Sequence, residues 1–290
     1  ALEINPNYIT AIVDLIAMYE ERDSKEQLIK DLEALTQLSP LKVIKDKIVL
    51  NCVEIASKNT NHEKAFKYYS KALEYLDIIG SENPELSNLK IQKAVIQNEM
   101  GNTPEAIKTL EDAVIEFPEN ERLLYYLATM YDKNNKKDEA LKIMEKILQL
   151  NPDNPDALNY IGYSYVDKKI NLGKAKELIS RALMILPDDI YVMDSMGWAY
   201  FSTGDYKNAI IQLERALKLA NDKQIFEPEI IEHLMSAYKQ AGMNDKIKQT
   251  YSDLLNSGIY KDKKNELKTL FEKFNEIPER KPASIDINKK

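Results

Sequence analysis

The chain has 290 residues, of which 44% are hydrophobic, so it is long enough to bury a substantial core. Its net charge of −7 arises from interspersed acids and bases, and no basic stripe is present to neutralise a phosphate backbone, which argues against nucleic acid as a partner. A single cysteine, Cys52, excludes an internal disulfide framework, and no apolar run approaches the ~20 residues of a membrane-spanning helix.

Only 8 glycines and 11 prolines interrupt a sequence dominated by helix-forming residues, which predicts an all-α fold. The first residues, "ALEINP", are typical of the end of a helix that a proline stops. No initiator methionine, basic segment or apolar segment of a signal peptide precedes them. We therefore expect the start to be truncated, and this fragment alone leaves the localisation unknown.

Prolines recur at an almost constant interval along the chain. Pro6, Pro40, Pro118, Pro152 and Pro187 each close an apolar run, and Pro84 completes the series. Their successive spacings are 34, 44, 34, 34 and 35 residues, which indicates one repeat with a single ten-residue insertion. A period in this range is typical of a repeat architecture in which each unit buries its apolar face against the next.

Within each period an apolar helix is followed by a polar turn and a second helix with alanine at set positions. In one repeat these features are Gly197, Tyr200, Ala209, Leu213 and Ala216. The pattern resembles the tetratricopeptide repeat, in which small residues let two helices of a hairpin approach closely and a proline ends the second helix. The resemblance implies a right-handed superhelical α-solenoid of about seven hairpins with a C-terminal capping helix.

The repeat register predicts where each hairpin and each domain begins. First helices are expected near Ile9, Asp46, Ser87, Glu121, Pro155, Ile190 and Pro228. We expect N-terminal repeats over 1–84, C-terminal repeats over 85–260, a capping helix over 261–277 and a flexible tail over 278–290. The insertion falls near 78–86, within "YLDIIGSENPEL", and predicts a longer second helix or a weak junction there.

One side of each first helix lines the concave groove of a tetratricopeptide superhelix, and here it is predicted to be aromatic and acidic. The predicted groove residues are Arg122, Tyr125, Tyr126, Asp156, Asn159, Tyr160, Tyr163, Tyr191, Asp194, Ser195, Trp198, Phe201, Glu229, Glu232, His233 and Ser236. Either curvature buries these aromatic side chains against each other, or part of each ring stays free for a ligand. The only tryptophan, Trp198, is ninth in its repeat, whereas the tryptophan of the family is fourth, where this chain has Met193.

Other reactive side chains are interpreted as structural. The tyrosines at the eleventh position of a repeat are expected to pack in the hairpins, and they are Tyr19, Tyr131, Tyr165, Tyr200 and Tyr238. Neither His62 nor His233 has a second ligand at metal spacing, and Cys52 occupies a packing position. Asp188 and Asp189 are expected to cap a helix. We expect no catalytic residue, no metal and no cofactor.

Some tetratricopeptide domains bind a partner's C-terminal carboxylate with lysine and asparagine at the fifth and ninth positions of a repeat. Here such positions hold pairs like Asn159 with Tyr163, so this carboxylate clamp is absent. An acidic and aromatic groove favours a basic or apolar segment of a protein partner instead.

Two stretches, "DALNYIGYSYVDKK" and "DSMGWAYFSTGDYKNAIIQLERAL", resemble the paired block of exported bacterial tetratricopeptide proteins, many of them lipoproteins. The resemblance implies a non-enzymatic binding scaffold in the periplasm or cell envelope, with an assembly factor or a protease as its partner. A cytoplasmic cochaperone or regulatory adaptor, and a self-assembling structural module, remain alternatives. The sequence leaves the partner and the oligomeric state open.

Overall fold

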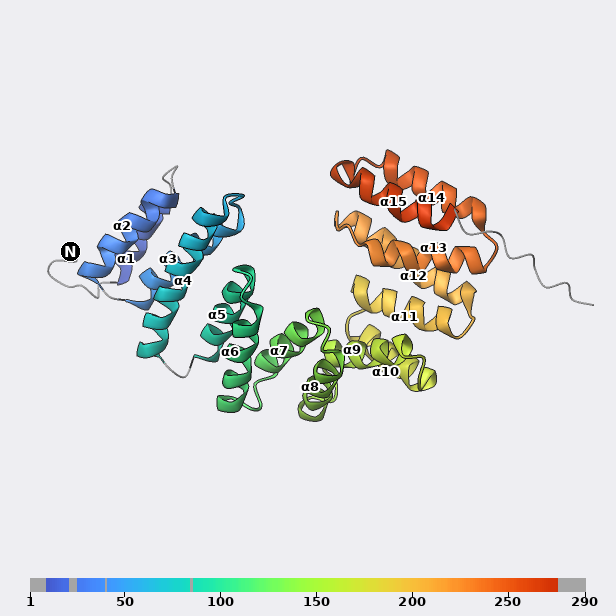
Figure 1. Ribbon diagram of the computed structural model, residues 1–290, viewed down its shortest axis with the longest axis horizontal. Helices are drawn as coiled ribbons and strands as arrows, with labels where there is room; N and C mark the ends of the chain where they lie inside the picture. Colours follow the sequence, from blue (N-terminus) through green and yellow to red (C-terminus); the bar gives the residue numbers. More distant parts are fainter. Residues whose placement is uncertain (1–8, 21–24, 40, 84–85, 276–290) are drawn as a thin grey trace, which may run out of the picture. The chain divides into compact units, whose positions relative to one another are not determined.

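The computed structural model describes residues 9–20, 25–39, 41–83 and 86–275, and every regular element in these ranges is a helix (Figure 1). The helices are α1 (Ile9–Glu20), α2 (Lys25–Leu38), α3 (Lys42–Ser57), α4 (His62–Glu82), α5 (Ser87–Glu99), α6 (Thr103–Glu116), α7 (Glu121–Lys133), α8 (Lys137–Leu150), α9 (Pro155–Asp167), α10 (Leu172–Ile185), α11 (Ile190–Ser202), α12 (Tyr206–Asp222), α13 (Pro228–Gln240), α14 (Asn244–Asn256), the 3-10 helix η1 (Lys261–Lys263) and α15 (Lys264–Asn275). None of these helices combines the length and the apolar character needed to cross a membrane. The sequence features that lie outside the described residues are Pro6, Pro40, Pro84, the side chain of Tyr19 and the predicted tail 278–290.

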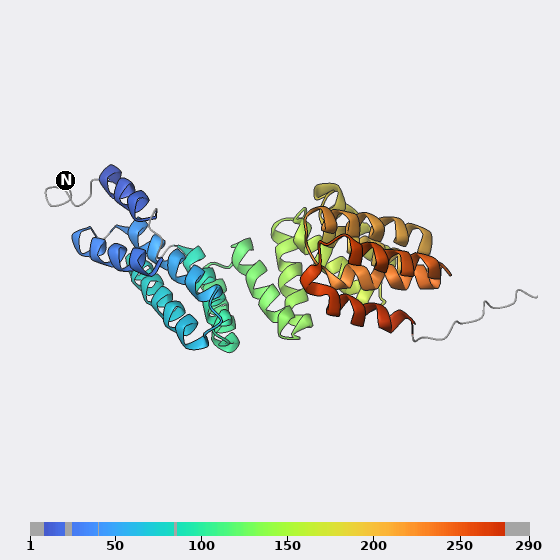
Figure 2. The same ribbon diagram turned by 90° about the horizontal axis from the view of Figure 1, so that it is seen from above.

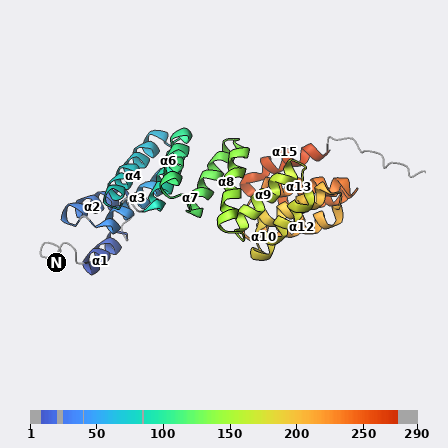
Figure 3. The ribbon, with the colours of Figure 1, turned by 90° about the horizontal axis from the view of Figure 1, so that it is seen from below.

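The helices pack as a series of hairpins, which confirms the predicted all-α solenoid. Within a hairpin, α3 packs on α4, α5 on α6, α9 on α10 and α11 on α12. Figure 2 and Figure 3 show the hairpins of α3 with α4 and of α5 with α6 from two sides. Between hairpins, α11 contacts α9 and α10 of the hairpin before it, and α13 contacts α11 and α12. These neighbouring hairpins thus bury apolar surface against one another.

Six of the seven first helices begin at the residue where the repeat register places them: Ile9, Ser87, Glu121, Pro155, Ile190 and Pro228. The prediction for the second repeat was wrong by about one turn, because α3 begins at Lys42 rather than near Asp46. The residues of this first turn are helical because Ile44 and Lys45 are buried, so packing extends the helix toward its N-terminus.

The chain divides into two compact units, which comprise residues 1–143 and 144–290. In the first unit the inserted residues add turns to α4, which has 21 residues. Leu76 of α4 shares a buried cluster with Leu89 of α5, so these two helices are packed together beside the insertion. The domain boundary expected at residue 84 stays a prediction.

Two lysines, Lys90 and Lys93, stand on α5 where the repeat pattern favours apolar residues. The ammonium nitrogen of Lys93 lies 2.7 Å from the carboxylate of Asp77, and that of Lys90 lies 3.9 Å from the carboxylate of Glu116. All four side chains line a cleft of about 240 Å³ beside the end of α4. The lysines therefore border a solvent-filled cleft instead of the core, which explains the departure from the pattern.

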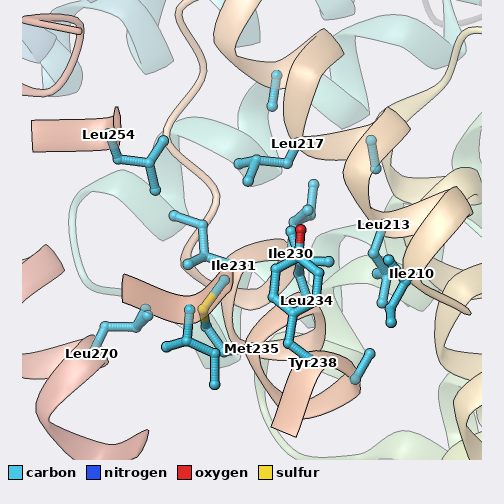
Figure 4. Close-up of a cluster of buried hydrophobic side chains, with 14 of the residues drawn as sticks. Ile210, Leu213, Leu217, Ile230, Ile231, Leu234, Met235, Tyr238, Leu254 and Leu270 are labelled. Carbon is cyan, nitrogen blue, oxygen red and sulfur yellow. The ribbon is translucent and has the colours of Figure 1, made fainter. Parts of the chain in front are cut away.

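The largest buried cluster of the second unit is built around α12 and α13 (Figure 4). Leu213 and Leu217 of α12 face Ile231 and Leu234 of α13 there, and Leu270 extends the cluster from α15. These side chains are all less than one-tenth exposed. Since α15 covers apolar side chains of α13 and α14, it acts as the cap that a terminal repeat requires.

Two glycines mark the closest approaches of the helices within hairpins of the second unit. A β-carbon built on Gly162 would lie 2.6 Å from Cγ1 of Ile179, and one built on Gly197 would lie 2.5 Å from Cγ of Leu213. The Ile179 and Leu213 side chains are fully buried, so neither can move aside without disturbing the core. Met193, at the position where the family has tryptophan, is also fully buried.

The turns between consecutive hairpins of the second unit are held by arginines that occupy matching places on the second helices. Arg181 of α10 donates to the carbonyl of Pro152 and the carboxylate of Asp153, at 2.7 and 2.9 Å. Arg215 of α12 donates to the carbonyl of Pro187 and the carboxylate of Asp188, at 3.0 and 3.3 Å. The proline and aspartate of each turn thus lie at a helix boundary and also accept hydrogen bonds from an arginine.

Two of the tyrosines at the eleventh position donate to a glutamate on the second helix of the preceding hairpin. The hydroxyl of Tyr131 lies 2.6 Å from the carboxylate of Glu111, and that of Tyr238 lies 2.6 Å from the carboxylate of Glu214. Burial, together with the hydrogen bond that Glu111 accepts, raises the pKa of Tyr131 to about 12. These contacts join neighbouring hairpins, so the two tyrosines are structural.

Replacing Gly197 by alanine is expected to lower the melting temperature, because the new methyl group overlaps the Leu213 side chain. The cost should be about 1–3 kcal/mol, as for other insertions into a well-packed core. Thermal unfolding followed by circular dichroism measures it. Gly173 is the matched control, since nothing lies within 4 Å of a β-carbon there. Gly173→Ala should leave stability unchanged or raise it by up to about 1 kcal/mol, and an equal loss in both variants would contradict the close approach.

Candidate functional site

The first helices α9, α11 and α13 of the second unit bring most of the predicted binding residues together. The middle helix, α11, contacts both of the others. Eight of its thirteen residues are buried, which follows from its almost uninterrupted apolar and small sequence, IYVMDSMGWAYFS. Its start is fixed by Asp189, whose carboxylate accepts hydrogen bonds from the backbone amides of Tyr191 and Val192 at 2.9 and 3.0 Å.

We define the Trp198 face by seven residues that interact on these helices and at the start of α13: Tyr163, Tyr191, Asp194, Trp198, Glu227, Glu229 and His233. At its centre the Trp198 indole stacks on the His233 imidazole, with ring centroids 4.0 Å apart and planes 12° apart. The Phe201 ring also stacks on the indole, at 4.5 Å and 6°. Trp198 remains partly exposed. Its position is therefore set by two ring contacts, one within α11 and one with α13.

A buried hydrogen bond between α11 and α13 holds the imidazole under the indole. Nδ1 of His233 lies 2.9 and 3.0 Å from the two carboxylate oxygens of Asp194, and both residues are less than one-tenth exposed. The shared proton belongs on Nδ1, because a carboxylate oxygen can only accept. Burial raises the pKa of Asp194 above its usual range, with Glu229 and Glu227 acting in the same direction, while His233 opposes them.

Two tyrosines of the Trp198 face donate to glutamates at the start of α13. The hydroxyl of Tyr163, on α9, lies 2.7 Å from Oε1 of Glu229, and the hydroxyl of Tyr191, on α11, lies 2.7 Å from Oε1 of Glu227. The first of these bonds passes from α9 to α13 and so spans one intervening first helix. The same Glu229 oxygen lies 3.9 Å from Nε2 of His233, which places it beside the buried pair.

The carboxylates of Glu227 and Glu229 raise the pKa values of the two tyrosines that donate hydrogen bonds to them. The hydrogen bond to Glu227 raises the pKa of Tyr191 to about 12, with burial as the next cause. Burial is the main cause that raises the pKa of Tyr163 above its usual range, and the hydrogen bond to Glu229 is the second cause. Since both folded-state pKa values are raised, these hydroxyl groups stay protonated, and their bonds stay intact, throughout the neutral range.

The remaining predicted residues of the second unit have varied environments. Asp156 is exposed, Tyr160 is half-buried and Ser195 is buried. Glu232 forms a 2.6 Å ion pair with Lys273 of α15, so the cap reaches this end of the face. Asn159 is half-buried, and its side-chain oxygen is the one predicted site atom that is buried without a hydrogen-bond partner in the described structure.

Three predicted residues, Arg122, Tyr125 and Tyr126, lie on α7 in the first unit. Arg122 is exposed, and Tyr125 is 36% exposed. The ring of Tyr125 meets that of Tyr126 edge to face, with centroids 6.1 Å apart. Tyr126 packs against the buried cluster of α5, α6 and α7. The two tyrosines therefore form a local aromatic pair in the first unit, and the part of all three residues in the binding groove stays a prediction.

Sequence reasoning missed Glu227 and Tyr206 as members or neighbours of this site, and it gave Asp189 only the helix-capping role that the structure confirms. Glu227 and Asp189 directly precede the first helices, so a register counted from the first helical residue passes over them. Tyr206, on the second helix α12, contacts the Phe201 ring at 5.5 Å between centroids. The helix-cap position before each first helix was the signal that could have revealed Glu227.

Known proteins share the repeat and the fold. A family model described as tetratricopeptide repeat matches residues 97–162, and a second model of the same description matches residues 191–223. A TPR repeat-containing protein of Pseudomonas aeruginosa is 30% identical over 156 residues, which are 53% of this chain and 26% of that protein. The protein O-mannosyl-transferase TMTC1 of Homo sapiens is 27% identical over 165 residues, which are 56% of this chain and 19% of that protein. The chain thus spans about a quarter of the first relative and a fifth of the second.

Two solved structures agree with this fold. A tetratricopeptide repeat protein from Parabacteroides merdae has a TM-score of 0.53 and 17% identity, covering 79% of this chain and 93% of that one. A thermophilic TPR protein of Thermus thermophilus also has a TM-score of 0.53, with 19% identity, covering 66% of this chain and all of that one. Together with the hairpin packing, these likenesses show the fold of a tetratricopeptide repeat solenoid, and the chain carries matched tetratricopeptide repeats at residues 97–162 and 191–223.

Proposed function

We propose that this chain is a non-enzymatic protein–protein interaction scaffold that binds a segment of a partner on the Trp198 face. The tetratricopeptide repeat fold itself implies a scaffold for protein interactions. The observation that supports the location is the combination of partly exposed Trp198 and Tyr191, the latter 53% exposed, with polar groups fixed beside them. Aromatic rings with a polar edge are enriched where proteins bind partners.

The contacts beneath the face support binding without a large rearrangement. Trp198 is restrained by the His233 and Phe201 rings, and Tyr191 by its bond to Glu227. A side chain that is already ordered loses less conformational entropy when a partner covers it. The Trp198 face is therefore suited to act as a preorganised anchor.

The finer part of the proposal is a bacterial cell-envelope role, as a lipoprotein or periplasmic adaptor for an assembly factor or protease. It rests on the resemblance of residues 156–169 and 194–217 to exported proteins. Fractionation of the native organism with an antibody to this chain tests it: an envelope fraction supports the proposal, and a cytosolic fraction favours the cochaperone or regulatory alternative.

One relative, TMTC1, is named a protein O-mannosyl-transferase, but this chain matches only 19% of that protein's length. The groups paired on the Trp198 face are engaged in hydrogen bonds and ring contacts that order the helices. The absence of catalysis is thus part of the proposal, and mannosyl transfer to a protein acceptor by the purified chain would contradict it.

Tyr191→Ala is expected to weaken binding about tenfold, because it removes a half-exposed ring at the centre of the contact. Segments selected from a peptide display library against the intact chain would be titrated singly, with Trp198 emission as the signal. Ile211 on α12 is 50% exposed on a second helix and provides the control. If Ile211→Ala weakens binding as much as Tyr191→Ala does, the site lies elsewhere.

Asp194→Ala is expected to destabilise the second unit by about 1–3 kcal/mol, because it leaves the His233 Nδ1 proton buried without an acceptor. Asp194→Asn keeps one acceptor oxygen and should cost less. Thermal unfolding and Trp198 emission of both variants measure the effect. Asp222→Ala, at an exposed position of α12, should change neither quantity, and normal stability of Asp194→Ala would show that the pair does not hold the stack.

A further inference from the structure

Charge is segregated between the two kinds of helix in the second unit. The first helices α9, α11 and α13 contain five acidic residues and one basic residue. The second helices α10, α12 and α14 contain eight basic and five acidic residues. Among the cap residues of these helices, Asp189 and Glu227 add two carboxylates before α11 and α13, and Lys168 adds one ammonium group after α9. The face formed by the first helices is therefore negative, and the other side of the hairpins is positive.

The first unit does not share this segregation. Its first helices α1, α3, α5 and α7 contain seven basic and seven acidic residues. The negative charge is thus a property of the repeats that carry the Trp198 face, and it does not follow from the repeat pattern, which both units share. Because the shared fold does not require this negative charge, the charge indicates which kind of partner the surface binds.

Glu227 and Glu229 carry this charge at the edge of the aromatic stack without a protein cation to neutralise it. Their hydrogen bonds come from the uncharged hydroxyls of Tyr191 and Tyr163. In the described part of the chain neither glutamate forms an ion pair with a lysine or arginine, and the one basic side chain recorded near Glu229 is His233, whose Nε2 lies 3.9 Å away. The Glu229 side chain is 63% exposed. Each tyrosine occupies one carboxylate oxygen, which leaves the second oxygen as an acceptor for a ligand.

Mutual repulsion among these carboxylates is visible at Asp194. Burial is the main cause of its raised pKa, and both Glu229 and Glu227 raise it further. A cation placed on the face would relieve this repulsion, whereas an apolar segment would cover the carboxylates and increase it.

We infer that the partner segment is basic and that Glu227 and Glu229 bind its arginine or lysine side chains beside the Tyr191 ring. This inference rests on the proposed function of the Trp198 face and selects the basic alternative over the apolar one. The free carboxylate oxygens accept the cation's hydrogen bonds, and the exposed Tyr191 ring packs on its alkyl or guanidinium part. The negative face attracts the segment over a distance limited by salt screening.

The test compares peptides of one backbone that carry arginine, its neutral isostere citrulline, or glutamate at the same positions. Each is labelled and titrated with the intact chain by fluorescence anisotropy at low and at physiological salt. We expect the arginine peptide to bind about tenfold or more tightly than the citrulline peptide, with the glutamate peptide weakest. Raising the salt concentration should weaken only the arginine peptide.

The double variant Glu227→Gln with Glu229→Gln should remove this preference, while its amide oxygens still accept from the two tyrosines. Glu177→Gln with Asp222→Asn removes the same charge from exposed positions on second helices and should keep the preference. Equal binding of the arginine and citrulline peptides, equal loss in both double variants, or no binding at about 1 mM overturns the inference.

The outcomes also separate this inference from the proposed function. If all peptides bind alike and Tyr191→Ala weakens them all, the Trp198 face binds partners but does not select cations. If the arginine peptide binds and Tyr191→Ala leaves its affinity unchanged, while the glutamine variant abolishes it, cations bind away from the aromatic site, and the inference fails because Tyr191 takes no part.

Discussion

The close approach of two helices within a hairpin is the constraint on which the second unit depends. Gly162 and Gly197 admit Ile179 and Leu213 to places that a single methyl group would fill. This contact sets which side of α9 and α11 faces inward, and so it also sets which residues remain on the opposite side. Which residues form the Trp198 face is therefore determined by the glycine contacts on the opposite side of α9 and α11.

Structural features that depend on a single residue at a fixed spacing, such as the start of a helix, could be predicted from the sequence. The prolines and small residues placed six first helices at their observed starts, because each acts through local backbone geometry or steric size. The start of α3 was misplaced although the sequence held a local signal for it. Five other first helices begin three residues after a repeat proline, and the same offset from Pro40 gives residue 43, one residue from the observed start at Lys42.

The partnerships across the site could not be predicted, because they depend on the rotation of one helix against the next. Asp194 and His233 are 39 residues apart and each stands on the predicted binding side of its helix. A polar residue considered singly is expected at the surface, whereas two that satisfy each other can be buried together. The same reasoning applies to Trp198, whose contact with His233 required the position of α13.

The hydrogen bond from Tyr163 to Glu229 has a consequence for how the second unit folds. In most repeat arrays each hairpin contacts only its neighbours, so stability is close to a sum of local contributions and the ends can fray one repeat at a time. A bond from α9 to α13 joins next-nearest hairpins and couples their opening to that of α11 between them. We expect this bond to favour joint opening of α9, α11 and α13, so that native-state hydrogen exchange protects the three first helices to a similar degree.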